Sequence, residues 1–318
     1  MTHFDAFNGD ADGICALHQL RLADPQDTVL VSGVKRDIAL LQRIDANAGD
    51  AVTALDISVA ENRAALVALL ERGVHVEWFD HHFAGDVPVH PNLRVTLDPS
   101  PRVCTGMLVD RHLGGRYRAW AVVAAFGDNL APEARALAAD LALDAARVDA
   151  LRDLGDALAY NAYGDTEADL VLHPVALYRL VHRHADPFSF IRDEPIFAQL
   201  RASRHDDLAQ AQRVTPAYAL PGASIYVLPD AAWSRRVRGA FANTLALASP
   251  GRAHAVLTPN ASGGLTASIR APVDGGAAAD VLCRKFPSGS GRAAAAGIND
   301  LPVDQLPALA REMARAYA

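Results

Sequence analysis

The stretch Phe7-Asn8-Gly9-Asp10-Ala11-Asp12-Gly13 closes the first apolar segment of the chain, residues 4–7, with acids and glycines. That segment has the length and apolarity of a buried strand. Asp10 and Asp12 are two positions apart, so we expect them to leave the strand on the same side. The glycines let the backbone turn closely around a bound group. Alone, the pattern is also typical of an ordinary turn, but at the carboxyl end of a parallel strand it predicts a ligand site.

The chain up to residue 130 alternates between strand-like and helical patterns. Further strands are expected over residues 28–32, 51–57, 75–79 and 94–97. Helices are expected over residues 14–22, 38–44, 59–72, 106–112 and 120–126. Ser58 and Glu61 have the spacing of a capping box at a helix start. Strand–helix–strand units of this length predict a mostly parallel sheet with helices on both faces.

Residues 131–205 are expected to be mainly helical, and a second alternation of strands and helices follows them. Beyond it, strands are expected over residues 224–228, 254–258 and 265–270, and helices over residues 237–247 and 306–317. The predicted fold class is therefore α/β, with a parallel-sheet N-terminal domain covered by helices, a helical connector and a smaller mixed-sheet α/β C-terminal domain. We expect the domains at residues 1–205 and 206–318.

Composition and charge exclude several classes of protein. The 318 residues carry a net charge of −7, include three widely separated cysteines, and contain no apolar run of the ~18 residues that a membrane span needs. No signal-peptide pattern opens the chain, so we expect a cytoplasmic protein without a membrane partner, disulfides or structural zinc. Residues 231–292 hold eight basic against two acidic side chains. Such a surplus suits a small anionic ligand rather than a long DNA duplex. The sequence is also compatible with a homodimer.

Three more apolar segments end in acids or histidines, namely at Asp56, at Asp80-His81-His82 and at Asp128. Burying several carboxylates at neighbouring strand ends is costly unless cations neutralise them. Oxygen ligands with one or two imidazoles suit Mn²⁺ or Mg²⁺ better than a thiolate-loving metal. Two such ions about 4 Å apart can clamp a phosphate and activate a water molecule. The recurrence therefore predicts a metal-dependent phosphate site.

In this order, the motifs resemble those of the DHH phosphoesterase superfamily, which is named for its Asp-His-His motif. The family includes RecJ exonucleases, nanoRNA and cyclic-dinucleotide phosphodiesterases, and family II inorganic pyrophosphatases. The resemblance covers both halves of the chain and rests on Asp10-Ala11-Asp12-Gly13, Asp56, Asp80-His81-His82, Asp128 and a C-terminal glycine-rich element. It implies a catalytic N-terminal domain that binds two Mn²⁺ or Mg²⁺ ions and a C-terminal domain that binds the substrate.

The resemblance also assigns roles to single residues. Asp10 would bind one ion and Asp12 the other, and Asp56 would bridge both. His81 and Asp128 would complete the ligands of the second ion. The remaining two residues of the motif would act beside the metals: His82 would contact the substrate phosphate or orient the site, and Asp80 would support the ligands from behind.

This chain departs from the family near its first motif. Many members have a histidine four residues before the first aspartate, where this chain has Ala6. RecJ-like members have an acid two residues before it, where this chain has Asn8. Asn8 offers only a neutral carbonyl oxygen as a metal ligand, so we expect the first ion to bind more weakly. Two equally tight sites would instead indicate that another residue, such as His3, completes the ligands of the first ion.

A second departure lies in the C-terminal glycine-rich element, residues 289–297. Arg292 stands where the family pattern has a histidine. We expect Gly289 and Gly291 to lead into a helix whose free N–H groups bind an anion, with Arg292 as a bidentate phosphate donor. The resemblance places Arg270 near the same ligand.

These patterns predict a hydrolase that cleaves a phosphate ester of a short oligonucleotide or small nucleotide with a two-metal-activated water. One alternative is a pyrophosphatase, polyphosphatase or phosphomonoesterase, because aromatic residues make up only 6% of the chain and leave few platforms for stacking bases. Another is a non-catalytic nucleotide-binding module. Lys35-Arg36, after the second strand, could contact phosphate, although paired charges at such a turn are usually solvated.

Overall fold

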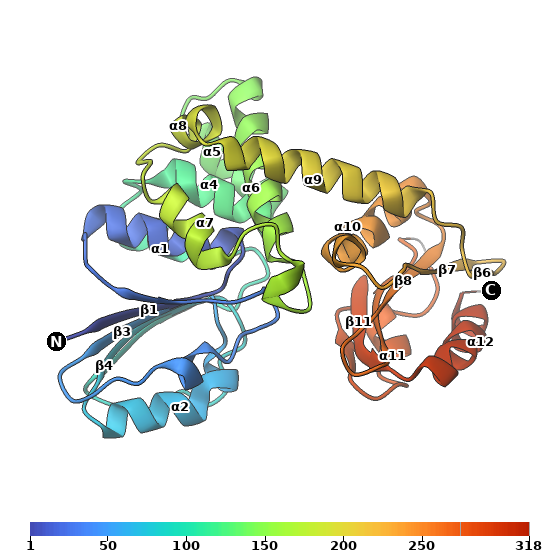
Figure 1. Ribbon diagram of the computed structural model, residues 1–318, viewed down its shortest axis with the longest axis horizontal. Helices are drawn as coiled ribbons and strands as arrows, with labels where there is room; N and C mark the ends of the chain where they lie inside the picture. The colour runs from blue at the N-terminus through green and yellow to red at the C-terminus, as the bar shows by residue number, and fades with distance from the viewer. Residues whose placement is uncertain (274, 318) are drawn as a thin grey trace. The chain divides into compact units, whose positions relative to one another are not determined.

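The computed structural model describes residues 1–273 and 275–317 of the chain (Figure 1). The chain divides into two compact units, Met1–Arg201 and Ala202–Ala318, which we call the first and the second unit. Each unit has its own sheet and its own apolar core. Because each buries apolar side chains around a separate sheet, each can be described by itself.

The first unit is built on a five-stranded sheet in which every strand pairs with its neighbour in parallel. Its strands are β1 (His3–Phe7), β2 (Val29–Val31), β3 (Ala51–Leu55), β4 (His75–Asp80) and β5 (Leu93–Leu97). The order β2-β1-β3-β4-β5 makes the chain change direction between β1 and β3. In doubly wound sheets, ligands bind beyond the carboxyl ends of the strands at such a switch point.

Helices cover both faces of this sheet, as a buried parallel sheet requires. Figure 1 shows α1 (Ala11–Ala23) on one face and α2 (Val59–Glu71) on the other. On the α2 face, Leu66 and Leu70 of the helix share a buried cluster with Trp78 of β4. The predicted α/β class with a parallel N-terminal sheet is thereby confirmed.

Two local predictions for this unit were wrong. Ser58 is the N-cap residue of α2, but its side chain makes no capping hydrogen bond. Its hydroxyl instead donates to the backbone carbonyl of Phe83 at 3.0 Å, so a tertiary contact replaces the expected capping box. The helix expected over residues 38–44 is only a 3₁₀ turn, η1 (Leu40–Arg43), whose leucines are buried. Packing of these leucines, rather than helix propensity, sets this segment.

The rest of the first unit is helical, as the sequence predicted. Its further helices are α3 (Thr105–His112), α4 (Arg118–Gly127), α5 (Ala131–Ala139), α6 (Ala145–Ala162), η2 (Glu167–Asp169), α7 (Pro174–Val181), α8 (Pro187–Asp193) and α9 (Pro195–Gln212), the last of which continues into the second unit. Among the described residues, no helix combines the length and apolarity needed to cross a membrane.

The second unit contains a six-stranded mixed sheet in the order β10-β11-β9-β8-β7-β6. Its strands are β6 (Tyr218–Ala219), β7 (Ala223–Val227), β8 (Ala253–Pro259), β9 (Leu265–Arg270), β10 (Gly289–Gly291) and β11 (Ala295–Leu301). Its helices are α10 (Ala232–Ala248), α11 (Ala279–Cys283), η3 (Val303–Gln305) and α12 (Leu306–Ala316). β7 and β8 pair in parallel and the other neighbours pair antiparallel, so the mixed sheet is confirmed.

Candidate functional site

Asp10 and Asp12 lie where β1 passes into α1. Asp10 is the N-cap of the helix, and its Oδ1 accepts hydrogen bonds from the backbone N–H groups of Asp12 at 3.0 Å and Gly13 at 3.1 Å. Asp12 already lies in the first helical turn. The expectation that both side chains leave an extended strand on the same side is therefore wrong, because α1 begins at Ala11 and helical geometry sets their directions.

Asp12 is fixed by the start of another helix, α3. Its Oδ2 accepts from the backbone N–H of Thr105 at 2.8 Å, and its Oδ1 accepts from that of Gly106 at 2.7 Å. Carboxylates are favoured at helix N-termini, where free N–H groups and the helix dipole meet them. The Asp12 carboxylate is buried, so these two bonds hold it in one orientation.

Asp56 follows β3 in a left-handed backbone conformation with φ of +59°. This conformation is uncommon outside glycine, although aspartate and asparagine tolerate it. The backbone N–H of Asp56 donates to the carbonyl of Phe79 at 3.0 Å, which ties the residue to β4. Its Oδ1 accepts from the Thr105 hydroxyl at 3.1 Å. The turn thus directs a buried carboxylate toward Asp12.

His81 is the point at which three carboxylates meet. Its Nε2 lies 3.4 Å from Asp56 Oδ1, 3.8 Å from Asp128 Oδ2 and 3.9 Å from Asp12 Oδ2. Ligand atoms of Asp12, His81 and Asp128 all lie within 4.8 Å of one another, as do those of Asp56, His81 and His82. Segments far apart in the sequence therefore converge at the carboxyl ends of β1, β3 and β4 and at the end of α4.

The electrostatics of this cluster call for a cation. Burial, and then the charges of Asp12, Asp10 and Asp128, raise the pKa of Asp56 well above its usual range. Burial is also the main cause of the raised pKa of Asp128. The charge of Lys35 lowers this pKa, and the charges of Asp12 and Asp10 raise it. A cation bound among these carboxylates would favour their ionised forms. Three carboxylates and an imidazole form a donor set that fits Mn²⁺ or Mg²⁺.

Asp80 and His82 form a pair at the end of β4. His82 Nδ1 lies 2.7 Å from Asp80 Oδ1, and Asp80 is fully buried. Burial lowers the pKa of His82, but the hydrogen bond and charge of Asp80, with the charges of Asp12 and Asp128, together raise it, so the net pKa is raised. The His82 side chain is 43% exposed. Asp80 therefore orients an imidazole whose other edge can face a ligand.

Lys35, which the sequence offered only as a weak phosphate contact, lies beside the carboxylates of this site. Its ammonium forms an ion pair with Asp10 and lies 3.5 Å from Asp128 Oδ1. Burial, the largest single influence, lowers the pKa of Lys35, but the charge of Asp10, together with Tyr163, Asp128 and Asp56, raises it to well above its ordinary value. The view of Lys35 as a solvated turn residue is thus wrong. A signal was available, since this lysine follows a strand of the same sheet edge.

Asn8 and His3 do not supply free metal ligands in this structure. Asn8 Oδ1 accepts from the Asp10 backbone N–H at 3.2 Å, and its Nδ2 donates to the Lys35 carbonyl at 3.2 Å. His3 lies at the opposite end of β1, where its Nε2 is 2.8 Å from Thr53 Oγ1. The suggestion that His3 completes the first ion's ligands is therefore wrong, because β1 separates it from the site.

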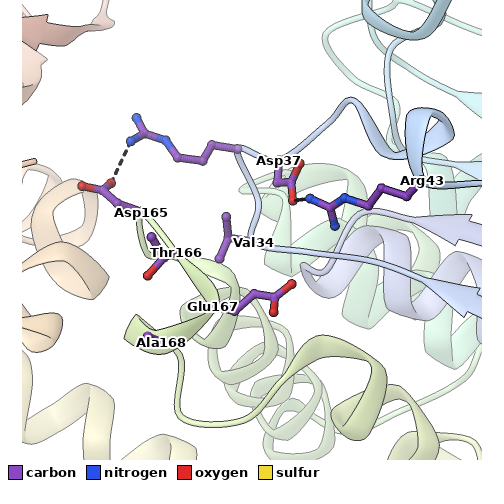
Figure 2. Close-up of a pocket in the computed structure, with 8 residues that line it drawn as sticks. Val34, Asp37, Arg43, Asp165, Thr166, Glu167 and Ala168 are labelled. Carbon is purple, nitrogen blue, oxygen red and sulfur yellow. Dashed lines mark hydrogen bonds and ion pairs between the residues drawn. The ribbon is translucent and has the colours of Figure 1, made fainter. Parts of the chain in front are cut away.

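A polar cavity of about 550 Å³ lies beside Lys35, since the neighbours of Lys35 in sequence, Val34 and Arg36, both line it. Figure 2 shows Asp165, Thr166 and Glu167 on one wall and Asp37 and Arg43 on another. Two ion pairs, between Arg36 and Asp165 at 2.7 Å and between Arg43 and Asp37, bring both charges to its surface. Five of its eight lining residues are therefore charged, and four of these are already paired with one another.

The glycine-rich element of the second unit has a different local structure from the predicted one. Residues Gly289–Gly291 form strand β10, which pairs antiparallel with β11. Between them, the Arg292 N–H donates to the Ala295 carbonyl at 2.9 Å and closes a tight turn. The predicted anion site at a helix N-terminus is wrong, because the chain enters a hairpin and not a helix. Substrate binding by Gly289, Gly291 and Arg292 stays a prediction.

Arg270 lies at the end of β9 beside this hairpin, where it pairs with Ala295 of β11. Its guanidinium donates to Asn243 Oδ1 at 2.6 Å and to Ser268 Oγ at 3.0 Å. These bonds fix the direction of the side chain. Arg292 is exposed at the turn, so both predicted substrate arginines belong to the same end of the second sheet.

Comparisons with known proteins identify the fold. No protein-family model matches the chain, and no curated protein matches it either. Among solved structures, exonuclease RecJ bound to manganese matches with a TM-score of 0.63 and 17% identity, over 99% of this chain and 89% of that chain. A pGpG-specific phosphodiesterase from Vibrio cholerae matches with a TM-score of 0.59 and 13% identity, over 99% of this chain and 98% of that chain. An exopolyphosphatase-related protein from Bacteroides fragilis matches with a TM-score of 0.50 and 12% identity, over 99% of this chain and 91% of that chain.

The matches extend over both units, and the identities are low, so they are likenesses of fold. The proteins matched are of the kinds that the motifs of this sequence resemble. The site residues lie at the carboxyl ends of the strands, where a doubly wound sheet holds its ligands. This chain therefore has the two-unit α/β fold of the DHH phosphoesterases.

Proposed function

We propose that this protein is a metal-dependent phosphoesterase that hydrolyses a phosphate ester of a short oligonucleotide or small nucleotide. The observation that carries the proposal is the convergence of Asp12, Asp56 and Asp128 on the His81 ring, at 3.4 to 3.9 Å. Burying acids in such numbers is costly unless a cation neutralises them. We assign hydrolysis to the first unit and substrate binding to the second, with Mn²⁺ or Mg²⁺ as the cofactor.

The cation would be held by Asp12, Asp56, His81 and Asp128. When bound, it would polarise a phosphate oxygen and lower the pKa of the attacking water. The protein residues act by orientation: α3 amides fix Asp12, and the Thr105 hydroxyl fixes Asp56. The manganese in the RecJ crystal structure supports the choice of ion.

His82 is proposed to contact the phosphate. Asp80 accepts from Nδ1 of the ring, which leaves Nε2–H on the exposed edge as a donor to a phosphate oxygen. The raised pKa of His82 favours the imidazolium, which binds an anion more strongly than the neutral ring does. In the second unit, Arg270 and Arg292 are proposed as substrate-binding residues.

Two observations bear on the substrate. The matched structures include an exonuclease and a pGpG-specific phosphodiesterase, which supports a nucleotide. The aromatic content of 6% offers few surfaces for base stacking, and an exopolyphosphatase-related protein is also matched. Pyrophosphate or polyphosphate is therefore the second candidate, and it differs from the first in needing no base contacts.

Replacement of Asp56 tests the proposed function. Asp56→Asn removes the charge but keeps a side chain that accepts the left-handed backbone at this position. We expect the rate of hydrolysis to fall at least about a hundredfold, because several kcal/mol of charge stabilisation depend on the cation that Asp56 holds. The measurement uses purified protein with Mn²⁺ on pyrophosphate, polyphosphate, pAp, pGpG, cyclic dinucleotides and RNA or DNA of two to five nucleotides.

The matched control is Asp86→Asn, since the Asp86 side chain is 85% exposed and forms a surface ion pair with Arg63. Its hydrolysis should equal that of the unaltered protein. Near-normal turnover of Asp56→Asn would contradict the assigned site. An unaltered protein that binds Mn²⁺ and nucleotides but cleaves nothing would instead be a binding module.

A further inference from the structure

Asp10 is already satisfied without a metal ion. Its Oδ1 accepts from two backbone N–H groups, those of Asp12 and Gly13, and its Oδ2 pairs with the Lys35 ammonium. Accordingly, Asp10 belongs to neither of the two groups of side chains that could hold a metal among the described residues. The acid that was expected to bind the first ion thus has a cation of its own.

The two neighbouring positions that could have supplied further ligands do not. Ala6 is fully buried in the apolar core of the first unit. Asn8 uses its amide N–H to bind the Lys35 carbonyl at 3.2 Å. An aspartate at position 8 would lack this donor, so the neutral amide suits the support of Lys35 better than it suits a metal.

Lys35 is held in place from several directions. Its backbone N–H donates to the Ala162 carbonyl at 3.0 Å, and its carbonyl accepts from Asn8. Its ammonium lies between Asp10 and Asp128 and 5.8 Å from the centre of the Tyr163 ring. The backbone and side-chain contacts of Lys35 therefore fix the position of its ammonium, which is not free to move as it would be on an open surface.

The choice of lysine at this position also stands out against the rest of the chain. The sequence contains 30 basic residues of the lysine and arginine types, and only Lys35 and Lys285 are lysines. An ammonium is a compact point charge, whereas a guanidinium is a broad planar fork. Only the compact group resembles a metal ion in size, so a lysine is the residue that can stand between two carboxylates in its place.

We propose that Lys35 takes the place of one of the two expected ions, so that the site binds a single divalent cation per chain. The ion would lie among Asp12, Asp56, His81 and Asp128, and the ammonium would neutralise Asp10. A second divalent ion at Asp10 would meet like-charge repulsion from Lys35. This inference rests on the proposed function and changes only the number of ions.

The ammonium would also serve the substrate. A lysine has three N–H donors; one is used in the hydrogen bond to Asp10, and the ion pair with Asp128 is longer, at 3.5 Å. The side chain is 32% exposed, which leaves a donor open to a phosphate oxygen. A fixed positive charge at the reacting phosphate stabilises the charge that develops there, which is the role of a second ion in a two-metal site.

Counting Mn²⁺ ions tests this proposal without relying on turnover. Equilibrium titration of the full chain, followed by the electron paramagnetic resonance of free and bound Mn²⁺, should give one ion for the unaltered protein and no spectrum of an exchange-coupled Mn²⁺ pair. Lys35→Glu replaces the cation with a metal ligand beside Asp10, so it should bind two ions and show the coupled spectrum. Lys35→Met should bind a second ion more weakly.

The control is Lys285→Met, which removes the other lysine, an exposed partner of Glu312 in the second unit. It should keep one ion. Two ions in the unaltered protein, or a single ion in Lys35→Glu with its first site intact, would overturn the proposal while the proposed function stands. Absence of Mn²⁺ binding in the unaltered protein would contradict the proposed function itself.

Discussion

His18 of α1 is a buried histidine outside the proposed active site. Its Nε2 lies 2.8 Å from the carbonyl of His184, and its ring meets the Trp120 ring edge-on with centroids 4.6 Å apart. Burial is the main reason that the pKa of His18 falls to about 3. The folded protein therefore keeps this ring neutral at pH values at which a histidine in the unfolded chain is already protonated.

This difference predicts a loss of stability in mild acid. Between pH 6.5 and 3 the unfolded chain binds one more proton at His18 than the folded chain, so the free energy of unfolding falls as the pH falls. From pH 7.5 to pH 5, the unaltered protein should lose about 2 kcal/mol more than a His18→Asn variant. Urea unfolding of both proteins at the two pH values measures this. Equal losses would show that His18 titrates normally in the folded state.

The site illustrates what a sequence reveals about single residues. Asp12, Asp56, His81 and Asp128 could be grouped from sequence alone, because the ends of parallel strands share one edge and acids there are conspicuous. Their roles as ligands are still predictions. Lys35 also follows a strand of this sheet edge, but its pairing with Asp10 could not be predicted, since nothing local distinguishes a lysine paired with a distant carboxylate from a solvated one.

Among the elements, α1 is attached to the sheet by a buried ion pair at the end opposite the site. Arg21 in its last turn donates to Asp5 of β1 through Nε at 2.9 Å and Nη2 at 2.5 Å. Thr28 and Thr53 add hydrogen bonds to the same pair. Asp5 is fully buried and Arg21 is nearly so. The pair fixes the tilt of the helix whose other end carries Asp10 and Asp12.

Removal of one partner should therefore be costly. Asp5→Ala leaves a buried, unpaired guanidinium and should lower the free energy of unfolding by about 3–5 kcal/mol. The combination of Asp5→Leu with Arg21→Met, which replaces both charges by apolar groups, should recover most of that loss. Urea denaturation of the three proteins measures both effects. A double variant as unstable as Asp5→Ala would show that packing, not the lone charge, is at fault.

Elements were predictable where burial and pattern agree. The strands β3 and β4 are short and rich in apolar residues, and their predicted ranges nearly match the observed ones. The hairpin of β10 and β11 was not foreseen, because Gly289-Ser290-Gly291 has no strand propensity and its pairing with β11 is a tertiary contact. The same reason explains η1, whose buried leucines pack on the sheet without a full helix.

At the scale of the whole molecule, the two units should respond separately to the metal. Trp78 and Trp120 belong to the first unit and Trp233 to the second. Mn²⁺ at a hundred times its dissociation constant should stabilise the first unit by about 2.7 kcal/mol, because only that unit binds it. Unfolding followed by fluorescence in a Trp233→Phe protein should shift with Mn²⁺. In a protein that keeps Trp233 alone, the transition should not move, and an equal shift would show that the units unfold together.

The hydrogen bonds from α3 to Asp12 have a consequence for the order in which this protein assembles. They join residues 93 and 94 positions apart, so the partners meet only after most of the first unit has folded. Because backbone and hydroxyl donors already orient Asp10, Asp12 and Asp56, the carboxylates need no ion to find their places. Small zinc domains, by contrast, fold only around their metal. We therefore expect the protein to stay folded when the ion is scarce and to bind the ion again without refolding.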